Sequence, residues 1–168
     1  CHPYILKELQ ALSLDDEAES LAELDSAFLG HVGYFMSVFV RSLVFYWTKA
    51  FFVMTPNAKQ AKTYYRQLTW ASSAFALLSD TCLIFFGGKL KFKEKLSGRL
   101  GDLLSSLYLS SCILKRYQKD QTPEEDFPVV KLALETQLFK FWSTYKDIID
   151  NIPNRWIRYG IRLVSIPF

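Results

Sequence analysis

The chain has 168 residues, of which 50% are apolar and 22% charged, and its formal net charge is +3. Such a length and apolar fraction predict one domain with a sizeable core, and such a small charge does not favour nucleic acid as a partner. The charge is unevenly placed, because residues 8–25 carry seven acids and no base, whereas residues 153–168 carry three arginines and no acid. We therefore expect the two ends to have different roles.

The first residues, "CHPYILKELQAL", start in the middle of an apolar pattern and predict a piece of a longer protein. A mature lipoprotein also begins with cysteine, but a flexible polar tether normally follows, so this reading is less favoured. Cys1, Cys82 and Cys112 form no CxxC pair, and the two interior thiols lie in apolar runs, which favours buried thiols and a reducing compartment. His2 and His31 lack partners at metal-ligand spacing, so no metal site is predicted.

Helical periodicity dominates the chain and strand signals are weak, so the predicted class is all-α. We expect residues 1–21 to form an acidic connecting segment and residues 22–168 a helical bundle domain. The fold predicted for that domain is an antiparallel four-helix bundle with a short C-terminal amphipathic helix. The acids of the connecting segment and the following turn are expected to be solvated rather than catalytic: Asp15, Asp16, Glu17, Glu19 and Glu23.

The first long helix is expected over residues 22–54. It is apolar almost all round, with Arg41 and Lys49 as its permanent charges between Ala27 and Met54. A transmembrane span is conceivable, but an arginine near its centre costs about 2.5–3.5 kcal/mol on insertion scales. We therefore favour a helix buried in the bundle over a membrane-embedded helix or one that faces a partner.

The second long helix is expected over residues 56–86, capped by Thr55, with Pro56 at its first position and Gly87-Gly88 at its end. Apolar residues recur along it at alternating steps of four and three, the spacing of a bundle seam. They are Tyr64, Leu68, Ala71, Phe75, Leu78, Cys82 and Phe85.

The third long helix is expected over residues 91–117. Its apolar stripe is Leu96, Leu100, Leu103, Leu107 and Leu114, and a second face of small residues, Gly98, Gly101 and Ser105, is expected to admit a close neighbour.

The fourth helix is predicted to begin at the capping box Thr122-Pro-Glu-Glu125 and to run to about Asp150. One stripe holds Leu134, Leu138, Phe141, Tyr145 and Ile148, and a second holds Phe139 and Trp142. A short fifth helix is expected from Pro153 to residue 165.

The stretch "GGKLKFKEKLSGRLGD" at residues 87–102 opens with a pair of glycines and carries five basic residues. It has neither the GxxxxGK[ST] nor the GxGxxG spacing of a phosphate cradle, and no strand precedes it. A nucleic-acid arm would need a broader basic face with more stacking aromatics than Phe92 alone. The favoured interpretation is structural: the glycines close one helix and the lysines solvate the turn into the next.

The fifth helix places Arg155, Arg158 and Arg162 at steps of three and four beside aromatic and apolar residues. This pattern is typical of a helix in a membrane interface, and it suits docking on an acidic protein surface equally. The candidate membrane or docking surface comprises Arg155, Trp156, Arg158, Tyr159 and Arg162. Equal heights along antiparallel helices also predict a structural polar contact between Asp80 and Arg99, with His31 at a similar level.

The segment "GGKLKFKEKLSGRLGDLLSSLYLSSCILKRY" resembles the helical region that ends the large bacterial acyl-CoA dehydrogenases acting on long-chain fatty acyl-CoA. The resemblance extends to "CHPYILKEL", "YYRQL", "ALLSD" and "IPNRW" and so touches nearly the whole chain. It implies a parent flavoprotein that takes two hydrogens from its substrate in the first step of β-oxidation, with a glutamate base and FAD.

In this family the glutamate precedes the stretch that resembles "CHPYILKEL", so the resemblance assigns no catalytic or FAD-binding residue to these positions. It implies an accessory region that stabilises the enzyme and supports a homodimer or membrane association. Its partner is the dehydrogenase body of the same chain, in the bacterial cytoplasm or at the cytoplasmic face of the inner membrane. The alternative is a free-standing helical interaction module, which a flavoprotein reading frame upstream of Cys1 would exclude.

Overall fold

The computed structural model describes residues 4–14, 16–56, 59–119 and 124–165. Every regular element in these ranges is helical, which confirms the all-α class. The α-helices are α1 (Ile5–Ala11), α2 (Glu17–Thr48), α3 (Lys62–Phe86), α4 (Glu94–Lys119), α5 (Phe127–Asp150) and α6 (Arg155–Ser165). Short 3₁₀ helices precede three of them: η1 (Lys59–Ala61), η2 (Gly87–Phe92) and η3 (Glu124–Asp126).

The chain forms two compact units, residues 1–40 and residues 41–168, and α2 runs through the boundary. In the first unit α1 is held against α2. Ser20 Oγ donates a hydrogen bond of 2.8 Å to the Ala11 carbonyl, and the Tyr4 ring lies close to Gly30. A Cβ atom added at Gly30 would lie 2.4 Å from Tyr4 Cε1, so this close approach requires glycine. Helical structure thus begins within the segment predicted to be an acidic connection.

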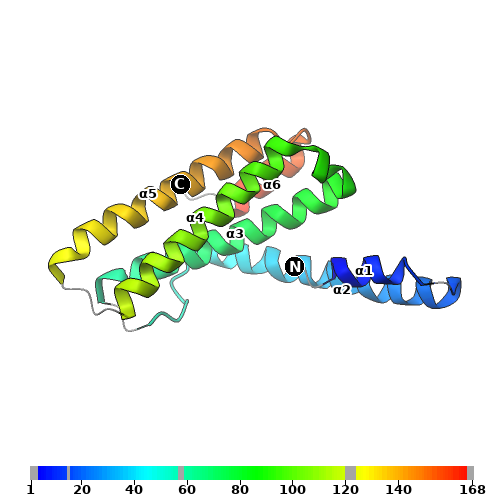
Figure 1. The fold of residues 1–168 in the computed structure, drawn as a ribbon, viewed down its shortest axis with the longest axis horizontal. Helices are drawn as coiled ribbons and strands as arrows, with labels where there is room; N and C mark the ends of the chain where they lie inside the picture. Colours follow the sequence, from blue (N-terminus) through cyan, green and yellow to red (C-terminus); the bar gives the residue numbers. More distant parts are fainter. Residues whose placement is uncertain (1–3, 15, 57–58, 120–123, 166–168) are drawn as a thin grey trace. The chain divides into compact units, whose positions relative to one another are not determined.

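The core of the second unit lies between α3, α4 and α5, which run side by side (Figure 1). All five residues of the predicted α5 stripe are buried, as are Leu103, Leu107 and Leu114 of α4. On α3 the predicted seam is confirmed at Ala71, Leu78 and Cys82, while Phe85 at its end is 42% exposed. The predicted bundle of four long helices stays a prediction, because this unit contains three of them and the last turns of α2.

Helix α6 packs on this core, and a buried hydroxyl group links it to α5 and α3. Ile161 and Val164 are buried, and the buried Tyr145 hydroxyl of α5 lies 2.8 Å from Ser165 Oγ and 3.2 Å from the Ala74 carbonyl of α3. Burial raises the pKa of Tyr145 well above its usual value, so the phenol stays protonated as a donor. One buried hydroxyl therefore ties α3, α5 and α6 together.

Among the helices, α2 differs most from its prediction, the long helix expected over residues 22–54. α2 ends at Thr48 because Lys49 and Ala50 adopt positive φ angles of 49° and 54°. Neither residue type favours this conformation, so the sequence does not predict the end of the helix here. The expected burial of this helix is wrong, since only 11% of its most apolar 18-residue stretch is buried. By length and composition, α2 and the segment Lys62–Phe92 could each cross a membrane, although 44% of the latter's apolar stretch is buried.

Several predicted boundaries and faces also need correction. Helix α3 begins at Lys62 rather than at Pro56, and α6 begins after Asn154, whose Oδ1 accepts from the Trp156 amide at 2.9 Å. The expected close neighbour of the small-residue face of α4 is wrong in the described ranges, where open space surrounds Gly98 and Gly101. Cys112 is exposed, because it lies on the outer side of α4. The capping residue Thr122 lies outside the described residues.

The glycine pair does end α3 as predicted, since the helix stops at Phe86 and Gly87 has a positive φ of 51°.

Candidate functional site

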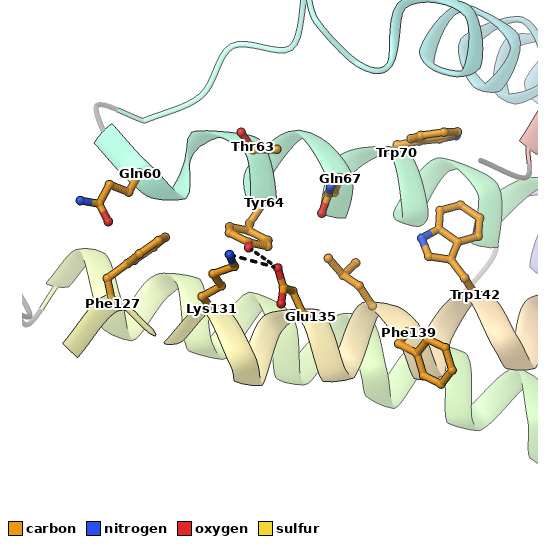
Figure 2. Close-up of a pocket in the computed structure, with 11 residues that line it drawn as sticks. Gln60, Thr63, Tyr64, Gln67, Trp70, Phe127, Lys131, Glu135, Phe139 and Trp142 are labelled. Carbon is orange, nitrogen blue, oxygen red and sulfur yellow. Dashed lines mark hydrogen bonds and ion pairs between the residues drawn. The ribbon is translucent and has the colours of Figure 1, made fainter. Parts of the chain in front are cut away.

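A groove between α3 and α5 combines aromatic, charged and amide side chains (Figure 2). Its volume is about 530 Å³, and aromatic and polar side chains from both helices line it. The lining residues are Gln60, Thr63, Tyr64, Gln67, Trp70, Phe127, Lys131, Glu135, Leu138, Phe139 and Trp142.

One end of this groove is aromatic. The ring centroids of Trp70 and Trp142 lie 5.5 Å apart, and Phe139 is 74% exposed beside them. Trp70 itself is 8% exposed, and its Nε1 has no hydrogen-bond partner within the described part of the chain. The aromatic end therefore offers apolar contact area with a buried indole in its wall.

The other end is polar, and its charges are already engaged. The Tyr64 hydroxyl donates to Glu135 Oε1 at 3.0 Å, and Lys131 Nζ lies 3.8 Å from the same oxygen (Figure 2). Burial, then the hydrogen bond and charge of Glu135, raise the pKa of Tyr64 to about 12. The phenol is therefore protonated at neutral pH and serves as the hydrogen-bond donor to this carboxylate.

A second hollow of about 600 Å³ lies where η2 and the start of α4 meet the connection between α5 and α6. Cations on its wall are Lys93, Lys95 and Arg99, with Glu94 as the only acid among the lining residues. The apolar part of the wall comes from Phe86, Phe92, Leu96, Ile148, Ile152 and Pro153. This hollow gathers the lysine turn and the junction before α6 into one region.

The three arginines of the candidate surface on α6 make different contacts. Arg162 pairs with the Asp150 carboxylate, and Arg158 Nη1 donates to the Asp150 carbonyl at 3.3 Å. Arg155 instead stacks over the exposed Trp156 ring, with its guanidinium carbon 5.1 Å from the ring centroid. Two of the three arginines thus hold α6 to the end of α5. No local pattern indicates Asp150 as their partner, since it is 12 residues from Arg162 and in another helix.

The structure describes the surroundings of two residues of the predicted polar contact, His31 and Asp80. His31 Nδ1 lies 2.9 Å from Glu8 Oε1 in the first unit, and the His31 ring stacks on Tyr4 with 11° between the planes. Asp80 lies on α3 and is 3% exposed, so its carboxyl group is buried. Contact between Asp80 and Arg99 itself stays a prediction.

No group of three or more metal-ligating side chains occurs among the residues that the structure describes. The two free thiols in these ranges differ: burial raises the pKa of Cys82 to about 11, so it is inert at neutral pH, whereas Cys112 is exposed.

Comparison with known families decides between the interpretations of this chain. Residues 1–168 match the family described as "Acyl-CoA dehydrogenase, C-terminal, bacterial type". The chain belongs to this family. The parent protein of this acyl-CoA dehydrogenase C-terminal region is therefore an acyl-CoA dehydrogenase, an oxidoreductase, as the resemblance implied. No solved structure matches the chain.

The family also implies FAD in the parent enzyme, and the groove of this C-terminal region is a poor fit for that cofactor. A flavin diphosphate needs free positive charge or backbone amides at a glycine-rich turn. The one cation of the groove, Lys131, is paired with Glu135, and no strand-to-helix turn occurs in the described ranges. No step of flavin chemistry is assigned to these residues.

Proposed function

We propose that this region is the non-catalytic C-terminal part of a FAD-dependent long-chain acyl-CoA dehydrogenase, where it stabilises the enzyme and supports a dimer or membrane association. The observation that carries the proposal is the exposed apolar surface of α2. In the first unit Phe28, Leu29, Val32 and Met36 are 45–69% exposed, and in the second unit Trp47 is 78% exposed.

Contiguous exposed apolar side chains are uncommon on isolated soluble domains and usually mark a contact surface. The dehydrogenase body of the same chain is the partner that family membership makes available. The polar end of the groove supports the non-catalytic part of the proposal, because its carboxylate already accepts a hydrogen bond from the phenol and pairs with the ammonium group.

The test compares the full-length dehydrogenase with a variant from which these 168 residues are deleted and with the region alone. We expect the region alone to be colourless and inactive, and the deletion to lower the melting temperature and flavin content of the remaining body. A flavin absorbance band or acyl-CoA dehydrogenation by the region alone would overturn the non-catalytic role. Unchanged stability, oligomeric mass and membrane recovery after deletion would overturn the accessory role.

A further inference from the structure

The turn between α3 and α4 presents an unusual concentration of positive charge. Residues 87–99 contain five basic residues and one acid, a net charge of +4, whereas the whole chain carries only +3. Four lysines alternate with other residues along this turn, and all four are exposed: Lys89, Lys91, Lys93 and Lys95. We call them the lysine turn.

The charges of the lysine turn are not paired with any acid that the structure describes. None of its four ammonium groups forms an ion pair within the ranges that the structure describes. Lys91 Nζ lies 4.9 Å from the centroid of the Phe92 ring, and Lys93 Nζ lies 4.9 Å from that of Phe86. These cation–π contacts hold two charges beside aromatic rings without cancelling them.

Large apolar side chains are exposed at the same end of α3. Phe92 is 76% exposed within the turn, and Ile84 and Phe85 in the last turn of α3 are 61% and 42% exposed. Basic residues interleaved with exposed aromatic and aliphatic side chains are typical of proteins that bind the interface of an anionic bilayer. A bilayer accommodates such a mixture without a complementary shape in the partner.

The arginines of α6 are less suited to this role than the lysine turn. Arg158 and Arg162 are engaged with Asp150, which holds α6 in place. The lysine turn also borders the hollow next to the α5–α6 connection, where Lys95 and Arg99 lie on the wall. An anionic headgroup in that hollow would meet cations from α4 and apolar contact from Phe92.

We propose that the lysine turn is the membrane contact of this region: its ammonium groups bind the headgroups of an anionic bilayer, and Phe92 inserts between them. This inference rests on the proposed membrane association and assigns it to residues 87–99. Binding is expected to weaken with salt, since screening shortens the range of the headgroup charge.

The experiment uses the full-length dehydrogenase and co-sedimentation with vesicles of phosphatidylcholine containing 30% phosphatidylglycerol, at low and high salt. The test variant is Lys89→Gln/Lys91→Gln/Lys95→Gln. A matched control, Lys62→Gln/Lys115→Gln/Lys119→Gln, removes the same charge from exposed lysines at the opposite ends of α3 and α4. Each lysine near an anionic surface contributes about a fivefold change in binding, so we expect roughly a 100-fold loss for the test variant.

The control should bind within about twofold of the wild type, because its lysines lie beyond the screening length from the surface. Equal losses in both variants would mean that net charge alone matters and would overturn the assignment. Wild-type-like binding by the test variant would overturn the assignment while leaving membrane association standing. No binding by the wild-type enzyme would overturn both.

Phe92→Ser tests the apolar part separately. It retains every charge and alters an exposed side chain, so the fold is expected to be unchanged by circular dichroism. We expect a severalfold loss of vesicle binding that persists at high salt, since insertion of the ring is hydrophobic. Unchanged binding by this variant would contradict insertion of Phe92.

Discussion

Helices α5 and α2 have similar apolar content and opposite environments. On α5 the apolar stripe from Leu134 to Ile148 is entirely buried, and the exposed residues lie on the other side. On α2 apolar residues occupy nearly the whole circumference, and half of the large ones are exposed. The difference teaches that an apolar pattern predicts burial when the apolar residues lie on one face of the helix, because a helix at the edge of a core packs against it with one face. An all-round apolar helix needs further partners.

The sharpest test of this contrast is truncation of one aromatic residue on each helix. Phe141 is 1% exposed and Phe28 is 58% exposed. In the purified chain, Phe141→Ala is expected to lower the free energy of unfolding by about 3–5 kcal/mol through lost burial and a cavity. Phe28→Ala should change it by less than about 0.5 kcal/mol. Urea denaturation followed by circular dichroism measures both, and similar losses would show that Phe28 is buried in solution.

The packing of α1 on α2 provides a second test, confined to the first unit. Gly30→Ala places a methyl group against the Tyr4 ring and is expected to destabilise this contact by about 1–3 kcal/mol. Gly33→Ala is the matched control, because open space surrounds Gly33 and alanine favours the helix by about 0.5–1 kcal/mol. Amide hydrogen exchange in α1 should accelerate in the first variant alone. Equal exchange in both would contradict the close approach of Tyr4.

The attachment of α6 to the core depends on a buried hydrogen bond. Tyr145→Phe keeps the ring and removes the hydroxyl that meets Ser165 and Ala74, with an expected loss of about 0.5–1.5 kcal/mol. Tyr159→Phe alters a 56% exposed ring on α6 and should have little effect. Thermal unfolding of both variants measures the difference. An unaffected Tyr145→Phe would mean that the hydroxyl contributes nothing to docking of α6.

The ion pair between Arg162 and Asp150 should contribute less, because both side chains are about 40% exposed. A double-mutant cycle with Arg162→Gln and Asp150→Asn is expected to give a coupling free energy of about 0.2–1 kcal/mol that decreases with salt. A coupling of zero at low salt would leave Arg162 available for a partner surface, as the sequence interpretation of α6 supposed.

Alkaline pH is expected to lower the free energy of unfolding, whereas a change of pH near neutrality is not. The pKa of Cys82 is about 11 in the folded chain against 9.0 for an ordinary thiol, and the pKa of Tyr64 is about 12 against 10.0. Above the lower values the unfolded chain loses these protons first, so the free energy of unfolding should fall from about pH 9 upward. Cys82→Ala should move the onset of this fall toward pH 10. An unchanged onset would contradict burial of the thiol.

Local signals predicted much of the second unit. Gly87 ends α3 as expected, because a positive φ there favours glycine, and the leucine stripe of α4 faces the core. The end of α2 was missed, since Lys49 and Ala50 adopt positive φ without glycine's permissiveness. The start of α6 was placed at Pro153, whereas Asn154 is the residue whose side chain caps the helix.

The polar contacts in the candidate groove could not be predicted from the sequence. Tyr64 and Trp142 were assigned to helix stripes, but Glu135 and Lys131 carried no signal of their own. Their meeting depends on α3 and α5 lying side by side, which is a contact between residues 71 positions apart. The same holds for Asp150 and Arg162.

The sequence by itself determined the helical class, the apolar stripes of α3, α4 and α5 and the family, because periodicity and motif are local properties of a chain. Only the tertiary structure decided that α6 packs on the core and that two of its arginines contact Asp150. It also decided that the lysine turn forms no ion pair with the acids that the structure describes. Such facts depend on which helices meet. Burial and charge pairing between distant residues follow from packing. The free energy of packing is spread over many weak contacts, so the sequence of one segment does not predict it.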